Sequence, residues 1–102
     1  MKRIILLFAF LGHILATTAQ SPVSNDIREA MNNYDYEAAL QLMEKTPSSI
    51  PLLYLKGKAL KELGRNNEAL NVFNQLTKQD SLNPRAYIEA GECYKTLGKF
   101  QP

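Results

Sequence analysis

Few residues of this chain have the types needed for acid–base, nucleophilic or metal chemistry. The sequence holds one histidine, His13, and one cysteine, Cys93. A single thiol does not make a zinc site, which takes about four ligands. Glu89 and Glu92 form a carboxylate pair, but acids three residues apart on an amphipathic helix are typical of a solvated face. We therefore predict no catalytic residue, no metal site and no enzymatic activity.

The glycines and the cysteine do not indicate a cofactor site either. Four glycines are separated by helical sequence instead of lying together in a phosphate-binding loop: Gly57, Gly64, Gly91 and Gly98. We expect no cofactor. Cys93 follows Ala90 at helical spacing, which favours a small buried hydrophobic side chain. Pairing of this odd cysteine with a second chain is the alternative.

The first 19 residues have the three-part layout of a secretory signal peptide. Lys2 and Arg3 form a positive head, residues 4–15 are an apolar run, and small side chains at 16–19 precede a cleavage site before Gln20. The apolar run is too short to span a bilayer, which takes about 20 residues. We therefore expect residues 1–19 to be removed and the remainder to be exported to the periplasm, cell envelope or exterior, with no stable membrane span.

Removal of this segment leaves a chain with no excess of charge. Lys2 and Arg3 are two of the 12 basic residues, so ten basic residues remain beside ten acidic ones. His13 leaves with the same segment, and the remainder has no imidazole. Nucleic-acid phosphates are bound by basic patches, which a neutral, mixed surface lacks. We predict no nucleic-acid partner.

Residues 20–102 have the periodicity of an all-α domain. Apolar side chains recur at steps of three and four residues, as in Ala69, Phe73 and Leu76, and no stretch alternates in the manner of a strand. Asp26 and Glu29 stand in the relation of an N-cap residue and its N3 partner, which predicts the start of the first helix. The predicted helices cover residues 26–31, 36–45, 50–63, 68–79 and 84–97, arranged in antiparallel pairs.

A period of 34 residues relates two parts of this helical region. Gly57 recurs as Gly91, and the same shift carries Lys61, Leu63 and Gly64 onto Lys95, Leu97 and Gly98. A fixed period of this length indicates stacked helix-pair repeats. We divide residues 20–102 into a degenerate repeat at 26–46, a complete repeat at 50–83 and a truncated repeat at 84–102.

The complete repeat resembles the tetratricopeptide repeat family. Leu53, Gly57 and Leu60 take the family's positions in the first helix, and Ala69 and Phe73 take those in the second. In the last unit Tyr87, Gly91 and Tyr94 fit the same frame. The resemblance implies a right-handed α-solenoid in which both glycines permit close helix crossings and Phe73 fills the space between units. The departures are Leu53, in place of an aromatic residue, Lys56, in place of an apolar residue, and the displaced Pro84.

The resemblance also implies a binding role. In this family the first helix of each repeat lines a concave face that binds a peptide or a partner protein. The positions of this chain that correspond to that face are Tyr54, Lys58, Lys61, Arg85, Ile88, Glu92 and Lys95. Their mildly basic and partly apolar character suits a weakly acidic peptide with an apolar anchor. The alternative is that they are ordinary solvent-exposed residues. The family's chaperone-tail binders use groove asparagines, but Leu55 and Lys58 stand at those positions here.

The last unit lacks a second helix, since residues 99–102 correspond to the turn at 65–68. We expect Tyr87 and Tyr94 to be partly uncovered as a result, and we predict that the chain is a fragment or the start of a longer product. The alternative to an interaction module is therefore a structural spacer, or the N-terminal segment of a larger envelope protein whose activity lies beyond residue 102.

Overall fold

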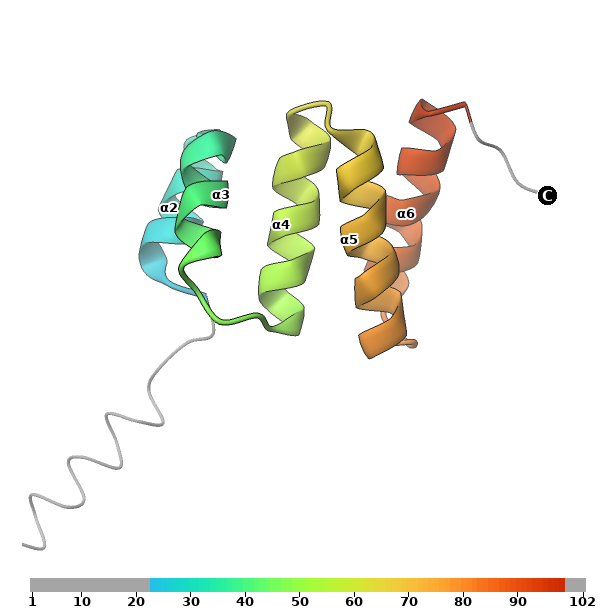
Figure 1. Ribbon diagram of the computed structural model, residues 1–102, viewed down its shortest axis with the longest axis horizontal. Helices are drawn as coiled ribbons and strands as arrows, with labels where there is room; N and C mark the ends of the chain where they lie inside the picture. The colour runs from blue at the N-terminus through green and yellow to red at the C-terminus, as the bar shows by residue number, and fades with distance from the viewer. Residues whose placement is uncertain (1–22, 99–102) are drawn as a thin grey trace, which may run out of the picture.

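The computed structural model describes residues 23–98 as a row of helices that alternate in direction (Figure 1). No strand occurs among these residues, and the predicted all-α class of helix pairs is confirmed. The predicted signal peptide at 1–19 lies outside the described residues. The helices are α2 (Asn25–Asn32), α3 (Tyr36–Glu44), α4 (Ile50–Glu62), α5 (Asn66–Gln79) and α6 (Pro84–Thr96).

Side-chain caps explain where the first helices of the pairs begin. The Ser49 hydroxyl accepts a hydrogen bond from the Leu52 amide at 3.2 Å, and this satisfies one of the free N–H groups at the start of α4. Asn83 caps α6 in the same way. The predicted cap at Asp26 is wrong: α2 begins one residue earlier, and Ser24 is its N-cap. The Ser24 hydroxyl lies just before the helix and accepts a hydrogen bond from the Ile27 amide, whereas Asp26 is already part of the first helical turn.

Glycines end the first helices of the last two units. Gly64 has φ of +79° and Gly98 has φ of +71°. These values lie in the left-handed region, which is favourable for glycine and strained for other residues. The predicted role of Gly64 as the residue that closes its helix is confirmed, and the chain then reverses into α5, which begins at Asn66 rather than at the predicted Glu68.

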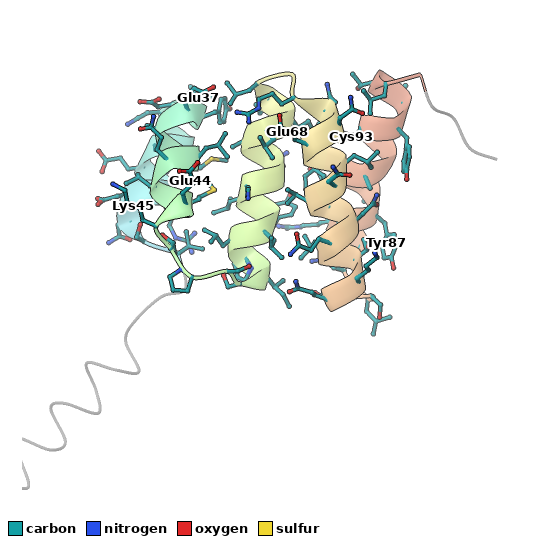
Figure 2. The ribbon with its side chains drawn as sticks, in the orientation of Figure 1. Glu37, Glu44, Lys45, Glu68, Tyr87 and Cys93 are labelled. Carbon is teal, nitrogen blue, oxygen red and sulfur yellow. The ribbon has the colours of Figure 1, made fainter. Side chains whose placement is uncertain are left out.

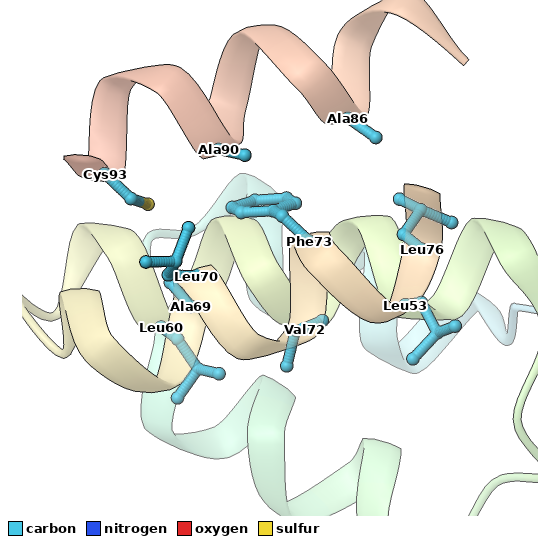
Figure 3. Close-up of a cluster of buried hydrophobic side chains, with 10 residues drawn as sticks. All are labelled: Leu53, Leu60, Ala69, Leu70, Val72, Phe73, Leu76, Ala86, Ala90 and Cys93. Atoms are coloured by element: carbon cyan, nitrogen blue, oxygen red, sulfur yellow. The ribbon is translucent and has the colours of Figure 1, made fainter. Parts of the chain in front are cut away.

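The main hydrophobic core lies between α4, α5 and α6 (Figure 3). Phe73 and Leu76 of α5 are fully buried in it, and so is Cys93 of α6. The Phe73 ring lies between α5 and α6. A second cluster joins α2 and α3 to the other side of α4 through Ile27, Ala39, Met43 and Leu52, with Val23. α4 thus contributes to both clusters and connects the two halves of the array.

Gly57 allows α5 to approach α4 closely. A Cβ atom at Gly57 would lie 2.5 Å from two ring carbons of Phe73. The prediction that this glycine marks a close helix crossing is therefore confirmed. The same prediction for Gly91 is wrong within the described residues, because no atom lies within 4 Å of where its Cβ would be. Among residues 23–98, no second helix packs against that face of α6.

The outer face of α6 is correspondingly uncovered. Tyr87 is 51% exposed and Tyr94 is 36% exposed, as predicted from the truncated unit. Their counterparts in α4, Leu53 and Leu60, are buried against α5. Figure 2 shows both Tyr87 and Cys93 on α6. Within residues 23–98, no helix has the length and apolar character required to cross a bilayer.

The two equivalent glycines give a matched test of this packing. Gly57→Ala forces a methyl group against the Phe73 ring, and overpacking of this kind costs about 1–3 kcal/mol. Gly91→Ala adds a methyl group at a helical position where no atom lies within 4 Å. Alanine loses less backbone freedom than glycine in a helix, so this change is expected to stabilise the protein by about 0.5–1 kcal/mol. Urea unfolding followed by circular dichroism measures both changes, and equal effects of the two substitutions would contradict the described packing.

Candidate functional site

The predicted groove residues lie on α4 and α6, which are in contact along the array. Tyr54, Lys58 and Lys61 recur at steps of four and three residues, so they share one face of α4. Arg85, Ile88, Glu92 and Lys95 follow one another at similar steps along α6. The structure therefore places the seven predicted residues in two rows on neighbouring first helices.

One carboxylate that the sequence analysis left out of the site connects these rows. Glu89 Oε2 accepts from Lys58 Nζ at 3.0 Å, and its Oε1 accepts from Lys61 Nζ at 2.6 Å. The Tyr54 hydroxyl donates to Glu89 Oε2 at the longer distance of 3.5 Å. Lys61 also forms an ion pair with Glu92. Four of the seven predicted residues thus belong to one network, and Glu89 is its centre.

Glu89 does not belong to a solvated face, which corrects the interpretation of the Glu89 and Glu92 pair. It is only 8% exposed, whereas Glu92 remains exposed. Burial alone would raise the pKa of Glu89, but the hydrogen bonds from Lys61 and Lys58 outweigh it and hold that pKa below the usual carboxyl value. Glu89 is therefore ionised at neutral pH.

Lys61 is held in its charged form by the same contacts. Burial would lower the pKa of Lys61, but the carboxylates of Glu89 and Glu92 raise it above the usual lysine value. The positive charges of Lys58 and Lys61 are thus largely balanced inside the protein. They add less positive potential to the groove than the sequence pattern suggested.

The remaining predicted residues stay outside this network. Ile88 is 60% exposed, and Arg85 and Lys95 are exposed as well. Neither cation forms an ion pair within residues 23–98. These three side chains are the part of the predicted site that is available to a partner.

A hollow of about 350 Å³ opens where the first turns of α2, α4 and α6 come together. Its lining combines apolar side chains with side chains that carry donor groups. Arg28 was not predicted as a site residue, because residues 26–46 follow the repeat pattern too weakly to place it. The apolar lining residues are Val23, Ile50, Pro51 and Leu55, and the others are Arg28, Tyr54, Asn83 and Arg85.

Cys93 has the properties of a core residue. It has no exposed surface, and burial raises the pKa of its thiol. The interpretation as a buried hydrophobic side chain is confirmed, and in this position the sulfur does not reach a second chain. Among residues 23–98, no three His, Cys, Asp or Glu side chains are placed to hold a metal ion.

The ion-pair network predicts a pH dependence of stability. The folded-state pKa of Glu89 is depressed, so its contribution is present above the ordinary carboxyl pKa and is lost as pH falls through the lower folded value. At neutral pH, Glu89→Gln should reduce the free energy of unfolding by about 1–3 kcal/mol, because two lysines lose a charged acceptor. The difference from the parent should shrink towards acidic pH.

Glu92→Gln is the matched control for this measurement. Glu92 is more exposed and contacts only Lys61 within the described ion pairs, so its removal should change the free energy of unfolding little. Urea unfolding at a series of pH values distinguishes the two variants. A Glu89→Gln protein whose deficit is the same at every pH would contradict the assigned role of the carboxylate.

Comparison with known families identifies the unit that contains this network's lysines. Residues 50–81 match the family model described as tetratricopeptide repeat, which covers α4 and α5. Comparison with curated proteins and with solved structures found no significant match. Repeats of this family are protein–protein interaction modules. The helix-pair packing and the matched unit agree, and residues 50–81 form a tetratricopeptide repeat.

Proposed function

We propose that this chain is a non-enzymatic interaction module that binds a peptide or a segment of a partner protein along the face formed by α4 and α6. The observation that carries the proposal is the Glu89 network. It fixes α6 against α4 by contacts with Lys58 and Lys61, and it leaves a row of unpaired side chains on the same face of α6.

The available row has the chemistry of a recognition surface. Ile88 offers an exposed apolar contact, and Arg85 and Lys95 lie about one turn before it and two turns after it. An extended segment with an apolar side chain flanked by acidic ones complements this pattern. The network beneath the row supports binding, because side chains on a fixed scaffold lose less freedom when a ligand binds.

Selection of random displayed peptides against the full chain tests this function. Enriched peptides should bind the parent and lose roughly tenfold in affinity, about 1.4 kcal/mol, when Ile88→Asp and Lys95→Glu are combined. Neither residue is buried or paired, so the fold should be unaffected. Leu82→Asp is the matched control, since Leu82 is a highly exposed apolar residue in the connection between α5 and α6.

Two outcomes would contradict the proposal. One is a selection that enriches no binding peptide, and the other is a set of binders that respond to Leu82→Asp but not to the α6 variant. Either outcome favours the alternative, in which the chain is a structural spacer or the leading segment of a larger envelope protein. That role needs no ligand on this face.

We further propose that the module works outside the cytoplasm, in the periplasm or cell envelope. The support is the sequence of residues 1–19, with its basic head, apolar run and small residues before Gln20. The equal numbers of acidic and basic residues after position 19 give no competing reason for an intracellular nucleic-acid partner.

Mass spectrometry of the protein from a fractionated bacterial host tests export. The periplasmic product should begin at Gln20. A Thr17→Arg and Ala19→Arg variant should accumulate uncleaved, because small residues at these positions are required for processing. A full-length parent protein in the cytoplasmic fraction would contradict this part of the proposal.

A further inference from the structure

We propose that the hollow between Arg28 and Arg85 binds a carboxylate side chain of an extended peptide, together with an apolar side chain next to it. This inference rests on the proposed function and names the ligand chemistry of one part of the groove. Arg28 was not among the residues predicted from the sequence. Its place in the hollow comes from the arrangement of three helices around one opening.

The backbone around the hollow favours an anion. The lining includes Ile50 and Pro51 from the first turn of α4, Asn83 and Arg85 from the start of α6, and Val23 from just before α2. Three helix N-termini therefore meet here, and each carries a partial positive charge of roughly half a unit. Their fields add, since all three ends lie at the same side of the array (Figure 1).

The two arginines supply full charges to the same opening. Neither Arg28 nor Arg85 forms an ion pair or a side-chain hydrogen bond within residues 23–98. Guanidinium groups bind carboxylates through paired N–H donors. Asn83 adds a further donor, because its Oδ1 accepts from Ala86 while its Nδ2 donates to no described residue. The hollow thus holds three unused donor groups.

The nearby carboxylate does not oppose an anionic ligand. Glu89 contacts Tyr54, which lines the hollow, but its charge is already balanced by Lys58 and Lys61 at 3.0 and 2.6 Å. An arriving carboxylate therefore meets the unbalanced charges of the two arginines. The buried network removes the repulsion that an unpaired glutamate would cause at this position.

The rest of the lining selects what lies beside the carboxylate. Ile50, Pro51 and Leu55 are apolar residues of the lining, together with Val23. A volume of about 350 Å³ is at the lower end of the range for ligand pockets, so it suits side chains and not a folded domain. Because the row from Arg85 to Ile88 continues along α6, the peptide extends past the hollow. We therefore assign the carboxylate to a side chain within the peptide.

Fluorescence anisotropy with the full chain and defined labelled peptides tests this site. The probe is a capped peptide of alternating leucine and glutamate, compared with the same peptide carrying glutamine. The glutamate peptide should bind about tenfold more tightly, which is the contribution of a charge-assisted contact. This preference should disappear in the Arg28→Gln and Arg85→Gln double variant. Arg65→Gln is the matched control, because Arg65 pairs with Glu68 in the turn before α5, outside the hollow.

The outcomes separate this inference from the proposed function. Equal binding of the two peptides, or a double variant that keeps the preference, overturns the carboxylate site. If peptides from the random selection still bind through Ile88 and Lys95, the interaction function stands without it. A preference that appears only when the peptide has a free C-terminus overturns the assignment to a side chain. Absence of any selected peptide overturns both proposals.

Discussion

The fit of Phe73 against Gly57 is the contact on which the other features of this fold depend. It brings α5 close to α4, and the same ring packs in the core that α6 joins. The separation of α4 and α6 is therefore set by the helix between them. A buried aromatic side chain has few alternative positions in a close-packed core. This contact therefore holds α5 against α4, and the position of α5 determines how α6 lies beside α4.

That geometry decides the electrostatics of the candidate site. Glu89 meets Lys58 and Lys61 only because α4 and α6 lie at contact distance. The site consequently has two kinds of positive charge. The lysines join the helices by their contacts with Glu89, whereas the arginines at the start of α2 and α6 have no ion-pair partner within residues 23–98. In our proposal a partner is recognised by these arginines and by the exposed apolar contacts beside them.

The sequence allowed the helix pairs to be predicted because their signals are local. The contact of Phe73 with Gly57, for example, could be predicted from their places in the 34-residue repeat and from the small size of glycine. The role of Glu89 depends instead on residues 28 and 31 positions earlier, on another helix, and its own neighbours suggested exposure. A useful signal was present: Glu89 is the counterpart of Leu55 one period earlier, and a charge at a repeat's apolar position needs a partner. Gly91 shows the reverse error, since the pattern implied a neighbour that the described residues do not contain.

The uncovered face of α6 also affects the time scale on which the groove exists. In a stacked array each helix pair is stabilised mainly by its neighbours, and among residues 23–98 α6 has neighbours on one side only. Local opening therefore costs less at the end helices α2 and α6 than at α4, and hydrogen exchange should be faster in these two helices. Opening of α6 separates Glu89 from the lysines and moves Arg85, Ile88 and Lys95 away from α4. The proposed peptide ligand would contact both α4 and α6, so its dissociation rate would be coupled to the local opening of α6.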